Sequence, residues 1–262
     1  MKNRFIFPLF LLIAMFNCTG REPKKADFIN RKVRLGNKTY PYMVYLPPAR
    51  ERSHKLPILL FLHGAGERGN DGHMQTQVGM GPAIRKNPER FKELIVVFPQ
   101  APAQTRWLQE PASAAMQALN QTIEEFNGDS KRIYLSGISM GGYGAWYLST
   151  EYPNRFAAVV PVCGGILPSA SVTSVRQLPR TIGSKEPYKV AAKAAPGVPI
   201  WIFHGEKDDV IPVSESRQMF EELKRLGARV RYSEYPEVEH NSWDRAYAEP
   251  ELWKWLLAQR TN

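Results

Sequence analysis

The sequence predicts one α/β domain with a mostly parallel central sheet and helices on both of its faces. Two observations carry this prediction. Short uninterrupted apolar runs alternate along the chain with segments that repeat apolar residues at helical spacing. Of the 262 residues, 43% are hydrophobic and 23% are charged, which is ordinary for a globular domain of this size. We find no internal repeat and no second domain.

Apolar runs without polar interruption are typical of strands that are buried on both faces of a parallel sheet. We predict strands at residues 32–35, 40–46, 58–62, 94–98, 133–135, 156–162, 198–203 and 230–235. Helical spacing predicts helices at residues 112–126, 214–226 and 250–259, with a shorter one around 188–194. The segment 165–197 is long for a connection, so we expect a small insertion that forms one wall of the active site.

The first residues resemble a targeting segment. Lys2 and Arg4 precede an apolar run from Phe5 to Phe16, which is too short to span a bilayer. We therefore predict a signal peptide at residues 1–17. Cys18 follows in a relaxed bacterial lipobox, so we expect an exported protein of the bacterial cell envelope. It would be anchored to the membrane by a lipid on Cys18, and with ordinary cleavage instead it would be periplasmic or secreted.

Residues 18–31 are polar and predict a tether, which leaves residues 32–262 as the catalytic domain. Cys163 ends an apolar run, so we expect a small buried side chain rather than a nucleophile. The net charge of +10 permits attraction to anionic surfaces. No basic run interleaved with aromatic residues is present, which argues against nucleic-acid binding. The sequence leaves the oligomeric state open.

One motif indicates chemistry. The sequence Gly-Ile-Ser-Met-Gly at residues 137–141 follows a predicted strand and precedes a helix-compatible segment. A G-x-S-x-G turn in this position exposes the nucleophilic serine of a hydrolase, here Ser139. The serine backbone is strained in such a turn, and side chains on either side would collide with the neighbouring strand and helix. The alternative is a glycine-rich turn with a capping serine.

A serine nucleophile needs a base, and the base needs a carboxylate to hold it. In hydrolases with this turn the order along the chain is serine, carboxylate, histidine. His240 follows the last predicted strand and is therefore the expected base. The expected acid is Asp208, in the loop after residues 198–203, with Asp209 as the fallback and Glu206 in the same loop. Either aspartate could instead cap the following helix.

The other histidines receive no catalytic role. His63 and His204 each end a predicted strand and precede glycine, so we interpret them as packing residues beside the site. His54 and His73 lie in polar loops. The loop at 63–69 is rich in glycine, which lets its backbone approach a substrate closely. We expect the backbone N–H groups of Ala65 and Met140 to form the oxyanion hole.

Together these motifs resemble those of a known family. It is similar to α/β-hydrolases of the bacterial carboxylesterase and "predicted peptidase" group, which includes dienelactone-hydrolase-like, polyhydroxyalkanoate-depolymerase-like and feruloyl-esterase-like enzymes. The resemblance covers about residues 33–258. It rests on the segments 42–47, 61–69, 137–146, 204–209 and 239–243.

The resemblance implies a serine carboxylesterase that works through an acyl-enzyme without a metal ion or organic cofactor. Members of the group cleave small esters, hydroxycinnamoyl esters on polysaccharide or aliphatic polyesters. Trp107 resembles a residue that borders the acyl pocket, although it could equally be a packing residue on the rim. Two alternatives remain: a serine peptidase of the prolyl-oligopeptidase type, and a surface lipoprotein that binds without catalysis.

Overall fold

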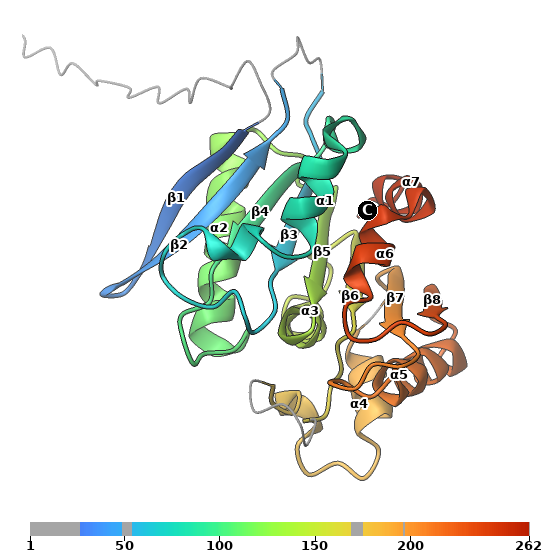
Figure 1. The fold of residues 1–262 in the computed structure, drawn as a ribbon. Helices are drawn as coiled ribbons and strands as arrows, with labels where there is room; N and C mark the ends of the chain where they lie inside the picture. Colours follow the sequence, from blue (N-terminus) through green and yellow to red (C-terminus); the bar gives the residue numbers. More distant parts are fainter. Residues whose placement is uncertain (1–26, 49–53, 169–174, 196, 262) are drawn as a thin grey trace, which may run out of the picture.

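The computed structural model describes residues 27–48, 54–168, 175–195 and 197–261. The predicted signal peptide, Cys18 and residues 18–26 of the predicted tether lie outside the described residues. Within them, eight strands form a single sheet in the order β1-β2-β4-β3-β5-β6-β7-β8 (Figure 1). Among these strands only β2 runs antiparallel to the others, because it pairs in antiparallel fashion with both β1 and β4, whereas all other neighbouring pairs are parallel. The predicted α/β fold with a mostly parallel sheet is confirmed.

The strand bounds are β1 (Asp27–Leu35), β2 (Lys38–Leu46), β3 (Ile58–Leu62), β4 (Ile95–Pro99), β5 (Ile133–Ile138), β6 (Ala158–Val162), β7 (Ile200–Gly205) and β8 (Val230–Tyr235). Every residue of β3 to β7 is buried. This burial explains why the apolar runs have no polar interruption. The parallel strands bring the loops that follow β3, β5, β7 and β8 to one edge of the sheet.

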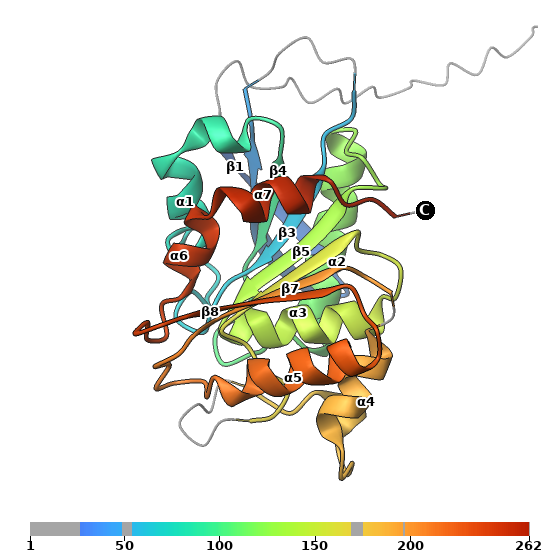
Figure 2. The ribbon, with the colours of Figure 1, turned by 90° about the vertical axis from the view of Figure 1, so that its right-hand side faces the viewer.

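The α-helices are α1 (Met80–Lys86), α2 (Gln109–Glu125), α3 (Met140–Glu151), α4 (Pro187–Ala194), α5 (Ser214–Arg225), α6 (Trp243–Ala248) and α7 (Pro250–Leu257). Short 3₁₀ turns lie at Met74–Thr76, Pro88–Phe91 and Pro179–Thr181. Apolar residues of α2, α3, α4 and α5 share one core cluster with the sheet, whereas those of α1, α6 and α7 share the other. Figure 2 shows α3 and α5 on the opposite side of the sheet from α6 and α7. Among the described helices, none is both long enough and apolar enough to cross a membrane.

The first strand corrects the predicted boundary between tether and domain. We expected a tether up to residue 31 and a strand from 32, but β1 begins at Asp27. Residues 27–31 pair in register with residues 42–46 of β2. Since β1 is an edge strand and mostly part-exposed, its side chains lack the continuous apolar pattern that marks the inner strands. Backbone pairing places these residues in the sheet, and backbone pairing leaves little trace in composition.

Two helices were not predicted. Helix α1 contains a glycine and a proline, and α6 spans only six residues directly after the predicted base. Their buried residues include Met80, Ile84, Ala246 and Tyr247, so they owe their helical form to packing on the sheet rather than to local propensity. The predicted insertion contains α4, which packs against α5.

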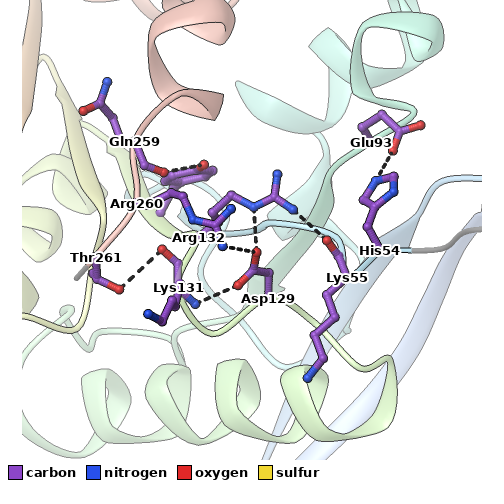
Figure 3. Close-up of polar contacts among 10 residues, drawn as sticks. His54, Lys55, Glu93, Asp129, Lys131, Arg132, Gln259, Arg260 and Thr261 are labelled. Carbon is purple, nitrogen blue, oxygen red and sulfur yellow. Dashed lines mark hydrogen bonds and ion pairs between the residues drawn. The ribbon is translucent and has the colours of Figure 1, made fainter.

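The end of the chain is fastened to the start of β5 by polar contacts (Figure 3). The backbone N–H of Thr261 donates to the Lys131 carbonyl at 2.9 Å, and Tyr134 donates through its hydroxyl to the Gln259 carbonyl at 3.1 Å. Asp129 accepts from Arg132 Nε at 2.7 Å and lies 3.4 Å from Arg260. These contacts lie at the amino ends of the parallel strands, opposite the loops that follow the strands.

We predict that Asp129→Asn lowers the free energy of unfolding at pH 7 by about 1–2 kcal/mol, because a neutral amide cannot pair with Arg132. Burial opposes ionisation of Asp129, but hydrogen bonds from Arg132 and Lys131 outweigh it, so the pKa of this carboxyl lies below its ordinary value. A lowered folded-state pKa gives stability that is present above about pH 4 and lost below it.

Urea denaturation at pH 7 and pH 3 measures this effect. Asp209→Asn is the matched control, since Asp209 is exposed. An Asp129→Asn variant that is no less stable than the control at pH 7, or whose deficit is the same at pH 3, would contradict the prediction.

Candidate active site

Ser139 occupies a strained turn between β5 and α3. Its φ of 52° and ψ of −118° lie outside the regions that residues with side chains usually adopt. Two glycines permit the turn. A Cβ on Gly137 would lie 2.1 Å from the Gly141 carbonyl oxygen, and one on Gly141 would lie 2.0 Å from the Leu62 carbonyl oxygen. The backbone N–H of Ser139 donates to the Val162 carbonyl at 3.0 Å, which fixes the turn to the end of β6.

The loops after β7 and β8 bring two further side chains to this turn. His240 Nε2 lies 2.9 Å from Ser139 Oγ, and His240 Nδ1 lies 2.8 Å from Asp208 Oδ2. An ionised carboxylate can only accept, so Nδ1 carries the proton and Nε2 accepts from the serine hydroxyl. The Asp208 side chain is fully buried, whereas that of His240 is 19% exposed. The three side chains therefore form one hydrogen-bonded line that reaches solvent at the histidine.

Asp208 is held as an anion. Burial opposes its ionisation, but hydrogen bonds from His204, His240 and the backbone N–H of Ile211 outweigh burial, and they hold the pKa well below its usual range. Its Oδ1 accepts from the backbone N–H groups of Val210 and Ile211 at 2.9 and 2.8 Å. The carboxylate thus stays charged at neutral pH without contact with water.

His204 corrects the sequence-based interpretation, which made it a packing residue. Its Nε2 lies 3.1 Å from Asp208 Oδ2 and 3.0 Å from the Ile211 carbonyl oxygen, and its Nδ1 lies 2.6 Å from Ser216 Oγ. Both neighbours of Nε2 are acceptors, so Nε2 carries the proton and the Ser216 hydroxyl donates to Nδ1. His204 is therefore a second imidazole that donates to the carboxylate. The four-residue spacing to Asp208 is the sequence signal that could have found it.

The other carboxylates of this loop lie elsewhere. Asp209 is exposed, and Glu206 accepts from the backbone N–H of Glu237 at 3.1 Å. Among these three carboxylates, Asp208 is the one that contacts His240. His54 and His73 are exposed, and His54 pairs with Glu93 at 3.1 Å.

His63 orders the loop after β3. It is fully buried, and burial lowers its pKa to about 4. Its neutral ring donates through Nδ1 to the Gly64 carbonyl at 2.6 Å and accepts the backbone N–H of Ala101 at Nε2, at 3.0 Å. A Cβ on Gly64 would lie 3.7 Å from Ser139 Cβ, so this loop passes beside the serine.

This loop and the start of α3 hold the two expected oxyanion donors. Met140 is the first residue of α3, so its N–H has no acceptor within the helix. The N–H of Ala65 shares its peptide with the Gly64 carbonyl, which His63 Nδ1 holds at 2.6 Å, and the Ala65 carbonyl in the next peptide accepts from Arg68 Nε at 2.8 Å. Their role toward a substrate remains a prediction.

Trp107 is only 2% exposed. Its indole N–H donates to the His63 carbonyl at 2.9 Å, and its ring meets the His63 ring edge to face at 4.9 Å between centroids. It also lines a small pocket with Met140 and Gly144. Trp107 thus packs against the loop after β3 and holds it in place. A direct contact between Trp107 and an acyl group remains a prediction.

Cys163 is buried, as expected, and burial raises the pKa of its thiol. Within the described chain, Cys163, Asp208 and His240 have donor atoms that lie within 4.8 Å of one another. Both nitrogens of His240 already form hydrogen bonds, to Asp208 and to Ser139. This group is therefore the serine site itself and gives no separate ligand set for a metal ion.

The chain matches the profile of the prolyl oligopeptidase family over residues 100–260. It belongs to this family of α/β-hydrolases. Over 159 residues it is 30% identical to a bifunctional acetylxylan esterase/xylanase of Neocallimastix patriciarum. The aligned region covers 59% of this chain and 20% of that protein. An uncharacterized secreted protein of Arthroderma benhamiae is 27% identical over 220 residues, or 76% of this chain and 23% of that protein. The chain thus spans about a fifth of the length of these relatives.

Solved structures show the same fold. A thermostable esterase superposes with a TM-score of 0.73 at 30% identity, covering 89% of this chain and 63% of that one. A ferulic acid esterase gives a TM-score of 0.63 at 14% identity, covering 89% and 97%. An acylaminoacyl peptidase of Pyrococcus horikoshii gives 0.64 at 18% identity, covering 86% and 40%.

We predict that His204→Phe lowers the free energy of unfolding at pH 7 by about 1–3 kcal/mol, because it removes a donor from the buried Asp208 carboxylate and leaves Ser216 without its acceptor. His204→Gln restores part of this loss, since its amide keeps an N–H. The pKa of Asp208 lies below its ordinary value. The difference in the free energy of unfolding between the natural protein and His204→Phe should therefore be largest above about pH 4 and become smaller as the pH falls below about 4.

Urea denaturation across this pH range provides the measurement. His54→Phe is the control for adding a phenyl ring, because His54 is exposed. If the His204→Phe deficit did not change with pH, His204 would be a packing residue, as the sequence first indicated.

Proposed function

We propose that this protein is a serine hydrolase that cleaves carboxylic esters through an acyl-enzyme. The observation that carries the proposal is the hydrogen-bonded line from Ser139 through His240 to Asp208, placed on the strained turn between β5 and α3. A protein that only binds has no need of this arrangement. The hydrogen-bonded base therefore weighs against the alternative of a non-catalytic surface lipoprotein.

In this mechanism Ser139 Oγ attacks the ester carbonyl carbon while its proton passes to His240 Nε2. Asp208 stabilises the imidazolium that forms and keeps the ring in place. The negative charge on the carbonyl oxygen is met by the N–H groups of Met140 and Ala65, and one such donor contributes about 10²–10³ in kcat. When the intermediate collapses, His240 returns the proton to the departing alcohol.

The second half of the reaction restores the enzyme. A water molecule gives a proton to His240 and attacks the acyl carbon, which again places negative charge on the carbonyl oxygen. Collapse of this intermediate releases the carboxylic acid, and His240 returns the proton to Ser139 Oγ. The partial exposure of His240 gives water access to the base, while Asp208 stays dry.

The preferred bond is the ester bond. An acetylxylan esterase/xylanase and a thermostable esterase are both 30% identical to this chain over the aligned residues, which favours ester cleavage. The family also includes peptidases, so amide cleavage is the second candidate. Small esters, hydroxycinnamoyl or acetyl esters on polysaccharide, and aliphatic polyesters are the substrate classes that the proposal covers.

We further propose that the protein is exported. One relative is described as a secreted protein, and the first residues resemble a signal peptide that ends before Cys18. Lipid attachment at Cys18 would hold the domain at the cell envelope. Mass spectrometry of the mature N-terminus tests this, and a mature chain that lacks an acylated Cys18 would rule out the anchor.

We predict that the protein hydrolyses 4-nitrophenyl acetate and butyrate, and that Ser139→Ala abolishes this activity. Asp208→Asn should lower kcat by about 10³–10⁴, because the amide no longer fixes the required tautomer of His240. Asp209→Asn, which changes a neighbouring exposed carboxylate, should leave kcat within about twofold. Hydrolysis that survives Ser139→Ala would overturn the proposal.

Matched N-acetylalanine derivatives separate the two candidate bonds in the same assay. We expect a higher kcat/KM for the 4-nitrophenyl ester than for the 4-nitroanilide by a factor well beyond their difference in intrinsic reactivity. An anilide that is cleaved as efficiently as the ester would favour the peptidase.

A further inference from the structure

The peptide that joins Gly64 to Ala65 is held from one side by a buried histidine. His63 donates through Nδ1 to the Gly64 carbonyl at 2.6 Å, and its side chain is fully buried. In a trans peptide the carbonyl and the N–H point in opposite directions, and no cis peptide occurs in the described parts of the chain. The contact with His63 therefore sets the direction of the Ala65 N–H, which points away from the imidazole.

The N–H of Ala65 has no acceptor among the backbone contacts of the described chain. Ala65 itself is half-buried rather than enclosed. Its neighbour Gly64 lies against the nucleophile, because a Cβ on Gly64 would be 3.7 Å from the Cβ of Ser139. The amide that His63 orients is thus an unpaired donor beside the serine that attacks.

The His63 ring has one tautomer and one orientation. Its Nε2 accepts the backbone N–H of Ala101 at 3.0 Å, so Nε2 carries the lone pair and Nδ1 carries the proton. Burial lowers the pKa of His63 to about 4, which keeps the ring neutral at neutral pH. Trp107 meets the ring edge to face at 4.9 Å between centroids, and its indole N–H donates to the His63 carbonyl at 2.9 Å. These contacts hold the imidazole as a fixed donor to the peptide.

We propose that His63 is a positioning residue of the oxyanion hole, where it orients and strengthens the donor at Ala65. A carbonyl that accepts a hydrogen bond draws electron density from its amide nitrogen, so the N–H of the same peptide becomes a stronger donor. A donor that is already oriented needs no reorganisation when charge develops on the substrate oxygen. The inference rests on the proposed ester hydrolase function, and it replaces the packing role that the sequence indicated for His63.

Two amide substitutions separate the two hydrogen bonds of the imidazole. The side-chain amide of asparagine lies near the position of Nδ1, whereas that of glutamine reaches the position of Nε2. His63→Asn therefore keeps a donor for the Gly64 carbonyl and leaves the Ala101 N–H without its acceptor. His63→Gln does the reverse. Since each variant loses one buried hydrogen bond, we expect urea denaturation to show a similar loss of stability for both.

The readout is the ratio of kcat/KM for 4-nitrophenyl acetate to kcat/KM for its thionoester, in which sulfur replaces the carbonyl oxygen. Sulfur is a weak hydrogen-bond acceptor, so the thionoester gains little from the oxyanion hole. We expect His63→Gln to lower the ratio by about fivefold or more, because one oxyanion donor contributes about 10²–10³ in rate. His63→Asn should keep the ratio within about twofold of the natural protein.

Gln100→Leu is the control for loosening of the same loop. Gln100 is buried, donates to the Glu67 carbonyl at 3.1 Å and accepts the Gly72 N–H at 2.8 Å. Among the described contacts, none joins its side chain to the peptide that follows Gly64. This variant should lose stability as the His63 variants do, yet keep the ratio of the natural protein.

The outcomes separate this inference from the proposed function. If hydrolysis depends on Ser139 but both amide variants give the same ratio, His63 acts by packing alone, so the inference is overturned and the hydrolase stands. A ratio that Gln100→Leu lowers as much as His63→Gln also overturns it, and this comparison stands even where His63→Asn does not fold. His63→Phe, which keeps a ring but neither hydrogen bond, replaces His63→Gln if that variant does not fold. If no ester is hydrolysed, both the function and the inference fail.

Discussion

The turn at Ser139 requires that backbone lie against backbone with no side chain between them. Gly137 and Gly141 meet each other and the end of β3 at distances where a Cβ would overlap a carbonyl oxygen. This close approach fixes the serine in a conformation that isolated residues avoid, and it points the start of α3 at the loop after β3. The base, the acid and the expected amide donors are all placed relative to this turn.

A buried negative charge is the second constraint. The Asp208 carboxylate is shielded from water. It instead accepts hydrogen bonds from two backbone N–H groups and from the rings of His240 and His204. The same contacts tie the loop after β7 to the loop after β8. A buried carboxylate that accepts hydrogen bonds at both oxygens costs less than a bare buried charge, and the bond from His240 fixes the direction in which that imidazole faces. Orientation of the base and stability of these loops therefore depend on one carboxylate.

The sequence predicted the inner part of this structure well, because burial on both faces leaves an unbroken apolar pattern. The fully buried strand at 58–62 has the predicted bounds, and the residues Ser139, Asp208 and His240 are brought together. The start of β1 was wrong because pairing at an exposed edge depends on the backbone. His204 was misread because a histidine at the end of a buried strand is most simply a packing residue, although its partner Asp208 lies only four residues further along the chain.

The most direct test of the account is the site at which a fluorophosphonate probe reacts with the folded protein. The probe forms a covalent bond with a serine that an adjacent base has activated. Peptide mass spectrometry should find one adduct, on Ser139, and His240→Phe should slow its formation by about 10³ or more. A folded protein in which Ser139 stays unlabelled, or in which labelling is as fast without His240, would contradict the central claim.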